Sequence, residues 1–161
     1  VVVRAAAASD AAAIATIYCA RHGEDAAEVT AAVGRHLSAI ADGRAPDRVF
    51  VASIDGVTDG YGKCGRRDYS GTGAADGWYL LGIVVSEHHR RCGVGRALTA
   101  ARLAWLAAQG ATDCWYFTNV RNPASVAMHE EFGFTEVTRD FVIPKITVPG
   151  GSILLRCRLS G

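Results

Sequence analysis

The sequence predicts a mixed α/β (α+β) fold, in which strands and helices alternate along the chain. Short β-branched runs bounded by turn residues recur throughout, as is typical of strands. Between them lie longer stretches whose apolar residues repeat every three or four positions, as in amphipathic helices. A chain of 161 residues has the size of one ordinary domain. We therefore expect a single domain over residues 1–161.

The expected elements follow one another in the order βααβββαβαββ. They are, in chain order, a strand at 1–5, helices at 11–21 and about 24–41, strands at 48–54, 57–65 and 78–85, a helix at 93–109, a strand at 112–119, a helix at 123–132, and strands at 134–143 and 152–159. This order is that of a mixed domain rather than of a regularly alternating parallel fold.

Caps and periodicity define the elements of the first half. Ser9 or Asp10 is expected to cap the first helix, because a side-chain oxygen there can accept a free backbone N–H group. Apolar residues at helical spacing within 29–40 define the second helix. The turn at Asp55-Gly56 separates two runs that alternate as strands do.

Apolar runs and punctuating residues define the second half. Trp78–Val85 is nearly continuously apolar, which is typical of a central strand buried on both faces. Gly110 and Gly133 stand where helix C-termini favour glycine. Pro123 suits the first turn of a helix, and the segment 144–151 joins the last two strands.

Composition excludes several classes of function. Seventeen basic and 16 acidic residues leave a net charge of +1, which argues against a broad nucleic-acid or membrane-binding face but not against a local anion site. The five cysteines form no C-x-x-C pair and no cluster with histidine, so we expect no metal site and free thiols in a reducing compartment. No secretion signal opens the chain and no apolar run spans a bilayer. We expect a cytoplasmic protein.

The most informative segment is 84–97, in which a buried strand runs into a basic, glycine-containing loop that opens a helix. Unpaired N–H groups and the helix dipole attract anions at such a helix start. Gly93 and Gly95 permit close approach of phosphate oxygens to the backbone. Three arginines can add charge-assisted hydrogen bonds, namely Arg90, Arg91 and Arg96. The segment therefore predicts a pyrophosphate site, the alternative being an ordinary strand–loop–helix junction. Neither the Walker loop nor the dinucleotide fingerprint fits it.

Two motifs resemble those of the GNAT superfamily of N-acetyltransferases. Arg90–Gly95 is similar to the family's Arg/Gln-x-x-Gly-x-Gly/Ala motif, and Asn122–Phe134 is similar to its Asn-x-x-(Ala/Ser)…Tyr-x-x-x-Gly-Phe motif. Their separation and the order of elements also match, so the resemblance covers nearly the whole chain. It implies the GNAT fold, a mixed and mostly antiparallel sheet of about seven strands with about four helices, splayed between the fourth and fifth strands.

The resemblance also implies a cofactor and a reaction. A GNAT enzyme binds acetyl-CoA and transfers its acetyl group to a primary amine by direct attack, leaving CoA as the product. The pantetheine arm pairs with the exposed edge of the fourth strand, here Ile83, Val84 and Val85. The remaining residues implied to bind the cofactor are Arg90, Arg91, Cys92, Gly93, Val94, Gly95, Arg96, Asn122, Ser125 and His129.

Two residues are candidates for proton transfer. Many GNAT enzymes place a tyrosine general acid where this chain has His129, and an imidazolium can also protonate a leaving thiolate. His129 otherwise only hydrogen-bonds the sulfur or is a polar residue on a helix face. The expected strand carboxylate that would act as base is absent from 78–85, which leaves Asp76 as the candidate. A water chain to the backbone or to a remote acid is the alternative.

The acceptor is expected to be a small-molecule amine. Candidate residues lie in the segments where family acceptors enter, together with nearby aromatic side chains: Glu24, Asp25, Glu28, Trp78, Tyr79, Tyr116 and Asp140. Clustered acids can pair with a polycationic amine, although acids also commonly decorate helix N-termini and strand aromatics are often core residues.

A second resemblance concerns the acceptor. The segments 78–82, 97–106, 115–117 and 136–141, with the tail at 144–155, are similar to those of aminoglycoside N-acetyltransferases of the kasugamycin-modifying 2′-N type. This resemblance implies acetylation of an aminoglycoside antibiotic and thereby resistance. The alternatives are acetylation of a peptide or protein N-terminus, acetylation of another small amine, and a catalytically weak CoA-binding regulatory module. Homodimers are common in the family, and the last strands are candidates for pairing.

Overall fold

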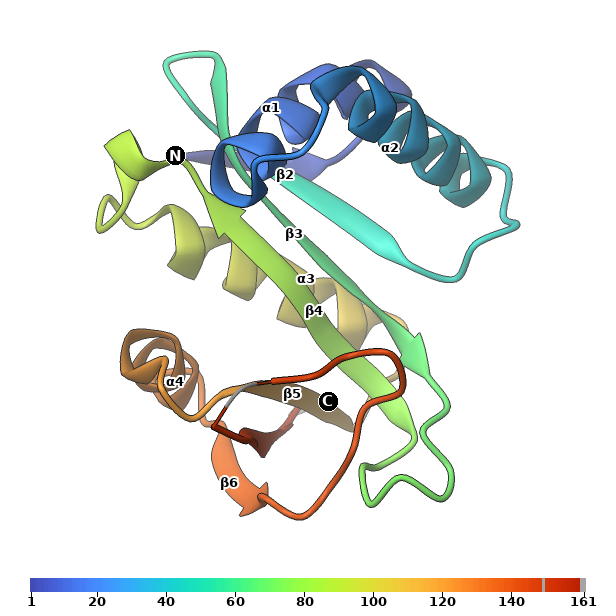
Figure 1. Cartoon of the computed structure of the whole chain (residues 1–161), viewed down its shortest axis with the longest axis vertical. Helices are drawn as coiled ribbons and strands as arrows, with labels where there is room; N and C mark the ends of the chain where they lie inside the picture. The colour runs from blue at the N-terminus through green and yellow to red at the C-terminus, as the bar shows by residue number, and fades with distance from the viewer. Residues whose placement is uncertain (149, 160–161) are drawn as a thin grey trace. The chain divides into compact units, whose positions relative to one another are not determined.

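The computed structural model describes residues 1–148 and 150–159, and it has the expected mixture of strands and helices (Figure 1). Residue 149, in the segment that joins the last two strands, lies outside the described residues. The strands are β1 (Val2–Ala5), β2 (Arg48–Ile54), β3 (Val57–Arg67), β4 (Gly77–Val85), β5 (Asp113–Asn119), β6 (Thr135–Thr138) and β7 (Ser152–Arg158). The α-helices are α1 (Ala11–His22), α2 (Ala26–Ala41), α3 (Val94–Ala108) and α4 (Pro123–Glu130), and single 3₁₀ turns lie at η1 (Ala8–Asp10) and η2 (Glu87–His89).

The seven strands form a mixed and mostly antiparallel sheet, as predicted. Their order is β1-β2-β3-β4-β5-β7-β6. Strand β2 pairs antiparallel with β1 and β3, and β7 pairs antiparallel with β5 and β6. Strand β4 pairs in parallel with β5 at Tyr79 opposite Trp115. The expected divergence of β4 and β5 beyond this pair stays a prediction.

The chain divides into two compact units. The first unit contains residues 1–65 and 81–102, and the second contains residues 66–80 and 103–161. Strands β3 and β4 and helix α3 each contribute residues to both units. The expectation of one domain over 1–161 stays a prediction, and each unit is described by itself below.

The core of the first unit lies between α1, α2 and strands β2 to β4. Helices α1 and α2 lie next to each other on this part of the sheet (Figure 1). Eight buried residues form one apolar cluster there, namely Ala11, Ile14, Ile17, Leu37, Val49, Val51, Tyr61 and Val84. The cluster fixes two helices on the face that also carries the side chain of Val84 from β4.

A wholly buried arginine joins α3 to the sheet within the first unit. The Arg102 guanidinium donates hydrogen bonds to the carbonyl oxygens of Leu98, Lys63 and Leu81, at 3.1 to 3.2 Å. Such bonds offset the high cost of removing a charged group from water. A Cβ atom at Gly62 would lie 3.1 to 3.3 Å from the same side chain, so glycine gives Arg102 its room on β3.

The predicted cap of the first helix is partly wrong. Helix α1 does begin after Asp10, but the Asp10 carboxylate makes no capping bond to it. Instead the carboxylate accepts from the backbone N–H of Ala7 at 2.7 Å and binds both terminal nitrogens of Arg4, at 2.7 and 2.8 Å. The Arg4 guanidinium is the main reason why the pKa of Asp10 is lowered. The side chain therefore ties β1 to the turn before α1.

The strand predicted at 134–143 is wrong beyond Thr138. After β6 the Thr138 hydroxyl accepts from the N–H of Asp140, and the N–H of Val142 donates to the carbonyl of Thr72. These bonds direct the chain toward the loop that precedes β4. Gly73 permits the contact, because a Cβ there would lie 2.7 Å from the carbonyl oxygen of Asp140.

Candidate functional site

The predicted pyrophosphate loop ends at the start of α3. Arg91 and Gly93 have positive φ angles, of 64° and 82°. The N–H of Ala97 donates to the Gly93 carbonyl at 2.9 Å, which makes Gly93 the last residue before the helix. By helix geometry the N–H groups of residues 94–96 have no acceptor within the helix. This arrangement fits an anionic diphosphate, and the space around the Gly93 Cα is open.

The side chains of the loop are largely exposed. Arg90 lies 3.5 Å from Glu87, and the thiol of Cys92 is exposed beside the carbonyl of Arg90, at 3.7 Å. Arg91 and Arg96 are exposed as well. In the predicted anion site the backbone would supply the fixed part, and the arginines would supply adjustable charge around it.

Gly60 of β3 seats the start of α3. A Cβ atom at Gly60 would lie 2.9 Å from the Val94 Cγ1 atom and 3.1 Å from the Val84 carbonyl oxygen. Val94 is almost wholly buried against the strand in this position. The sequence analysis missed Gly60, although a glycine within a strand often marks such a close approach.

A buried carboxylate holds the first residues of the loop. Asp59, which is 6% exposed, accepts from the Ser86 hydroxyl at 3.2 Å and from His89 Nδ1 at 2.8 Å. The Asp59 carbonyl also accepts from the backbone N–H of Ser86 at 2.8 Å. The strand-to-helix loop is thus fastened to β3 at both Gly60 and Asp59. Nothing in the motif spacing identifies Asp59, because its partners are about 30 residues away.

The backbone of β4 has a defined orientation at its C-terminal end. Because the N–H of Ser86 points to β3, and because successive strand residues alternate, the backbone groups of Val85 and Ile83 point away from β3. The side chain of Val84 enters the core of the first unit. This orientation is the one expected for residues that pair with an extended ligand arm.

The second unit brings four predicted residues together around α4. His129 is wholly buried, and its ring stacks on Tyr116 at 3.7 Å between centroids, with an interplanar angle of 8°. Its Nδ1 atom lies 2.7 Å from the carbonyl oxygen of Ser125, so Nδ1 carries the hydrogen. The Tyr116 hydroxyl is hydrogen-bonded to the Ser125 hydroxyl. Asn122 caps the same helix by accepting from the N–H of Ser125 at 3.3 Å.

Asp76, the candidate base, organises the loop before β4. Its carboxylate accepts from the N–H of Tyr69 at 2.6 Å and from the Ser70 hydroxyl at 3.0 Å. The hydroxyl of the buried Tyr79 donates to the carbonyl of Ala75 in the same loop, at 2.7 Å. Burial is the main reason that the pKa of Tyr79 is raised. Both predicted residues therefore have structural contacts in this loop.

The other predicted acceptor residues of the second unit lie apart from these contacts. The Trp78 ring packs edge-on against Trp105 at 5.9 Å between centroids, with the Arg66 guanidinium 5.3 Å from the Trp78 centroid. The side chain of Asp140 is exposed. These side chains do not form one cluster within the second unit.

The three predicted acids of the first unit also differ in what they do. Asp25 caps α2 by accepting from the N–H groups of Ala27 and Glu28, at 2.8 and 3.4 Å. Glu28 is exposed in the first turn of that helix. Glu24 accepts from the Tyr18 hydroxyl at 3.1 Å, and this bond is the main reason why the pKa of Tyr18 is raised. Of the three acids, Glu24 lines a cavity.

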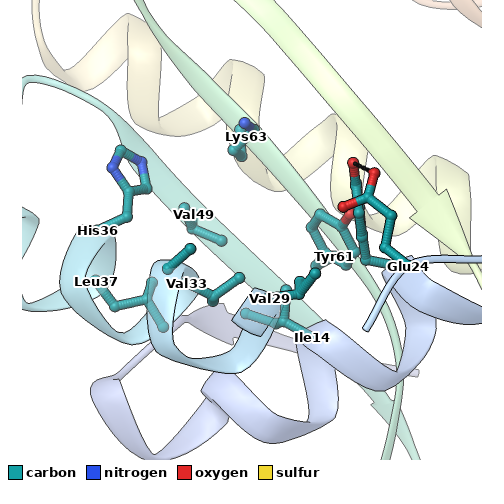
Figure 2. Close-up of a pocket in the computed structure, with 11 residues that line it drawn as sticks. Ile14, Glu24, Val29, Val33, His36, Leu37, Val49, Tyr61 and Lys63 are labelled. Atoms are coloured by element: carbon teal, nitrogen blue, oxygen red, sulfur yellow. Dashed lines mark hydrogen bonds between the residues drawn. The ribbon is translucent and has the colours of Figure 1, made fainter. Parts of the chain in front are cut away.

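This cavity, the α2 cavity, has a volume of about 350 Å³ and lies between α1, α2, β2 and β3 (Figure 2). Its lining is mainly apolar and consists of Ile14, Tyr18, Glu24, Val29, Ala32, Val33, His36, Leu37, Val49, Tyr61 and Lys63. The helical periodicity of the sequence did not indicate the cavity.

Two further features bear on the class of site. Among the described residues, no group of three or more histidine, cysteine or acidic side chains is placed to hold a metal ion. No helix in the described part of the chain is long and apolar enough to cross a membrane.

Comparison with known proteins agrees with the fold. The sequence profile of the acetyltransferase (GNAT) family matches residues 11–134. Aminoglycoside N(6′)-acetyltransferase type 1 of Klebsiella aerogenes is 35% identical over 101 residues, which are 58% of this chain and 63% of that protein. The match thus spans less than two thirds of the relative's length.

Solved structures share the fold across the whole chain. The ribosomal-protein-alanine N-acetyltransferase of Brucella melitensis has a TM-score of 0.73 at 21% identity, covering 99% of this chain and 100% of that one. A phosphinothricin acetyltransferase of Sinorhizobium meliloti, solved in complex with acetyl-CoA, has a TM-score of 0.73 at 18% identity, covering 99% and 88%.

Proposed function

Because this chain belongs to the acetyltransferase (GNAT) family, we propose that it transfers the acetyl group of acetyl-CoA to a primary amine of a small molecule. Acetyl-CoA is the cofactor of the family, and it supplies the acetyl group as a thioester that an amine nitrogen can attack. The observation that carries the proposal is the start of α3, where N–H groups without an acceptor inside the helix follow Gly93 and where Val94 packs closely against Gly60.

In this proposal the two units contribute different groups. Residues 90–96 hold the diphosphate, and the backbone of Ile83 and Val85 holds the extended arm of the cofactor. His129 is the proposed proton donor, which Ser125 and Tyr116 orient. Asp76 stays the proposed base, although its carboxylate also accepts two hydrogen bonds within its loop.

A matched pair of glycine substitutions tests the cofactor site. Gly93 and Gly43 both have positive φ angles, of 82° and 72°, and open space around the Cα atom. Alanine at either position costs about 1 kcal/mol of folding free energy through backbone strain. We expect only Gly93→Ala to weaken CoA binding, by about tenfold, when calorimetry measures the dissociation constant. Equal CoA affinity for both variants would contradict the assignment of the loop.

An aminoglycoside is one of two acceptor classes that we propose to test; the other, an amino acid, is argued from the α2 cavity in the next subsection. The support is the 35% identical relative together with the acids at the start of α2. Mass spectrometry should detect an acetylated product when the protein is mixed with acetyl-CoA and kasugamycin, or with an aminoglycoside that has a free 6′-amine. Acetylation of other amines but of no aminoglycoside would rule out this acceptor class and retain the transfer itself.

A catalytically weak CoA-binding module is the second candidate. The bonds of Asp76 within its loop and the absence of an acid from β4 favour it. It predicts that CoA raises the melting temperature while no amine in a broad panel is acetylated.

A cytoplasmic location and a homodimer stay predictions. Exposed Val137 and Val142 near the edge strand β6 support the dimer, which analytical ultracentrifugation would test.

A further inference from the structure

The α2 cavity is lined by one lysine side chain, Lys63, whose ammonium group has no partner among the described residues. The Lys63 side chain is half-buried, and its ammonium group makes no hydrogen bond or ion pair with any described residue. The neighbouring His36 faces Asp47, at 3.6 Å between Nε2 and Oδ2. A cation that has no partner in the described part of the protein and lies beside apolar walls favours an anionic group on a ligand near Lys63.

An acid lies elsewhere along the same cavity. Glu24 presents its carboxylate beside Tyr61, with the Tyr18 hydroxyl holding one of its oxygens (Figure 2). Tyr61 and Lys63 share one face of β3, and two residues along a strand span ~7 Å. Because Glu24 and Lys63 both line this cavity, one ligand within it can contact both side chains.

The space around these two charges is apolar. The walls include Val29 and Val33 of α2 and the buried side chains of Leu37 and Val49. A cavity of about 350 Å³ has the size that small-molecule sites usually have. Polyhydroxylated, polycationic amines suit it poorly, because they would bring hydroxyl groups against apolar walls and more positive charge toward Lys63.

We propose that the α2 cavity binds the acceptor as a zwitterionic amino acid with an apolar side chain. Its carboxylate pairs with Lys63, its ammonium group is directed to Glu24, and its side chain occupies the space beside Val33 and Val49. The inference rests on the proposed acetyl transfer and narrows its acceptor class. Tyr61 packs with Val84 of β4 in one cluster, so the end of the cavity near Glu24 lies beside the strand assigned to the cofactor arm.

The transfer that this acceptor undergoes is balanced without a further reactant. The ammonium group loses one proton to water or to a base, and its nitrogen then forms a bond to the acetyl carbon. The carbon–sulfur bond breaks, and the sulfur leaves with the electron pair and takes up a proton. Apart from one released proton, the products are the N-acetyl amino acid and CoA.

Two probes that differ in charge test the inference. L-Leucine carries the carboxylate, whereas L-leucinamide keeps the amine and the apolar side chain but lacks the negative charge. We expect kcat/KM to be about tenfold or more higher for L-leucine, measured by mass spectrometry of the acetylated products. We expect Lys63→Met to remove this difference by slowing the L-leucine reaction alone, and Lys63→Arg to retain most of it.

The other lysine of the chain supplies the control. Lys145→Met removes the same charge outside the first unit, and we expect it to change neither rate. If Lys63→Met lowers both rates, the substitution has damaged the fold, and Lys63→Arg becomes the test. A preference for L-leucine that is retained in Lys63→Arg then supports the inference, and loss of that preference overturns it. Equal use of both amines by the unaltered protein would overturn the inference and leave the acetyltransferase proposal standing.

Direct binding separates failure of the site from failure of the reaction. Calorimetry with L-leucine, in the presence of CoA and without acetyl-CoA, should give binding that Lys63→Met weakens by about tenfold. Binding of this kind without acetylation of any amine would overturn the proposed transfer but support the ligand class of the cavity. Absence of L-leucine binding would overturn the cavity assignment itself.

Discussion

The proposed pyrophosphate loop of the first unit and the cluster around His129 in the second unit differ in which groups of their motif residues are fixed by the fold. In the loop, the groups proposed to bind the diphosphate are backbone N–H groups, and the side chains around them are exposed. Around His129, the important groups are side chains that stack and hydrogen-bond within a wholly buried site. Substitutions in the two regions should therefore act differently. In the loop they should weaken CoA binding by changing the backbone conformation, and around His129 they should lower stability through lost packing.

The largest expected effect is that of His129→Ala. It removes a buried ring stacked on Tyr116 and the hydrogen bond to Ser125, which should lower the free energy of unfolding by about 3 kcal/mol. If His129 is the proton donor, kcat also falls, whereas the dissociation constant for CoA changes little. Chemical denaturation and a pH–rate profile at a temperature where the variant is folded measure these effects. An unchanged profile would remove His129 from the proton-transfer role.

Gly60→Ala should have the next largest effect and the reverse pattern. The added methyl group would meet Val94 and the carbonyl of Val84 at 2.9 and 3.1 Å, so the start of α3 must move. We expect a loss of about 2 kcal/mol in stability together with weaker CoA binding. Gly34→Ala is the control, because its methyl group has only an ordinary contact of 3.8 Å with Ala11 and should stabilise α2 by about 0.5 kcal/mol. Undiminished CoA affinity in Gly60→Ala would show that the loop does not depend on the close contact between Gly60 and Val94.

Asp59→Asn probes the same loop more gently. The change replaces the carboxylate that accepts from both Ser86 and His89 with an amide oxygen that is a weaker acceptor. We expect a loss of about 1 kcal/mol in stability and a modest rise in the CoA dissociation constant. Thermal unfolding with and without CoA separates the two effects. A larger change in kcat than in CoA affinity would show that Asp59 takes part in the reaction rather than positioning the loop.

The smallest expected effect compares an acid in each unit. Arg4 lowers the pKa of the buried Asp10, and Arg139 lowers the pKa of the exposed Glu136. A lowered carboxyl pKa stabilises the fold above the ordinary carboxyl value, and the contribution disappears as the pH falls through the lowered value. At neutral pH we expect Asp10→Asn to cost about 1 kcal/mol and Glu136→Gln to cost almost nothing. Denaturation at neutral and acid pH measures both, and equal losses would contradict the role of burial.

The regions that sequence predicts well are those where chemistry depends on neighbours in the chain. The spacing around Gly93 identified the start of α3, and the order of the elements identified the seven-stranded sheet. The contacts of Asp59, Gly60 and Arg102 were not predicted, because each joins residues that are far apart in sequence.

The capping error at Asp10 and the overlong last strand have a similar cause. The Asp10 carboxylate was expected to bind the nearest free N–H groups, but Arg4 and Ala7 compete for it successfully. The strand after Thr138 was predicted from its apolar residues, but the N–H of Val142 bonds to Thr72 instead of a neighbouring strand. In both cases local propensity correctly predicted the kind of hydrogen bond that a residue can make. It could not predict which partner the folded chain brings to that residue.

The exposed thiol of Cys92 has a practical consequence for measuring the reaction. Cys64, Cys114 and Cys157 are buried, and burial raises the pKa of the Cys64 thiol to about 12. Disulfide dyes that detect released CoA react with accessible thiolates, so they would also label Cys92 within the loop that we propose to bind the cofactor. If the loop binds CoA as proposed, such a dye would slowly inactivate the protein during the assay, and the progress curves would bend for a reason unrelated to turnover. A Cys92→Ser variant or direct detection of the acetylated product avoids this artefact.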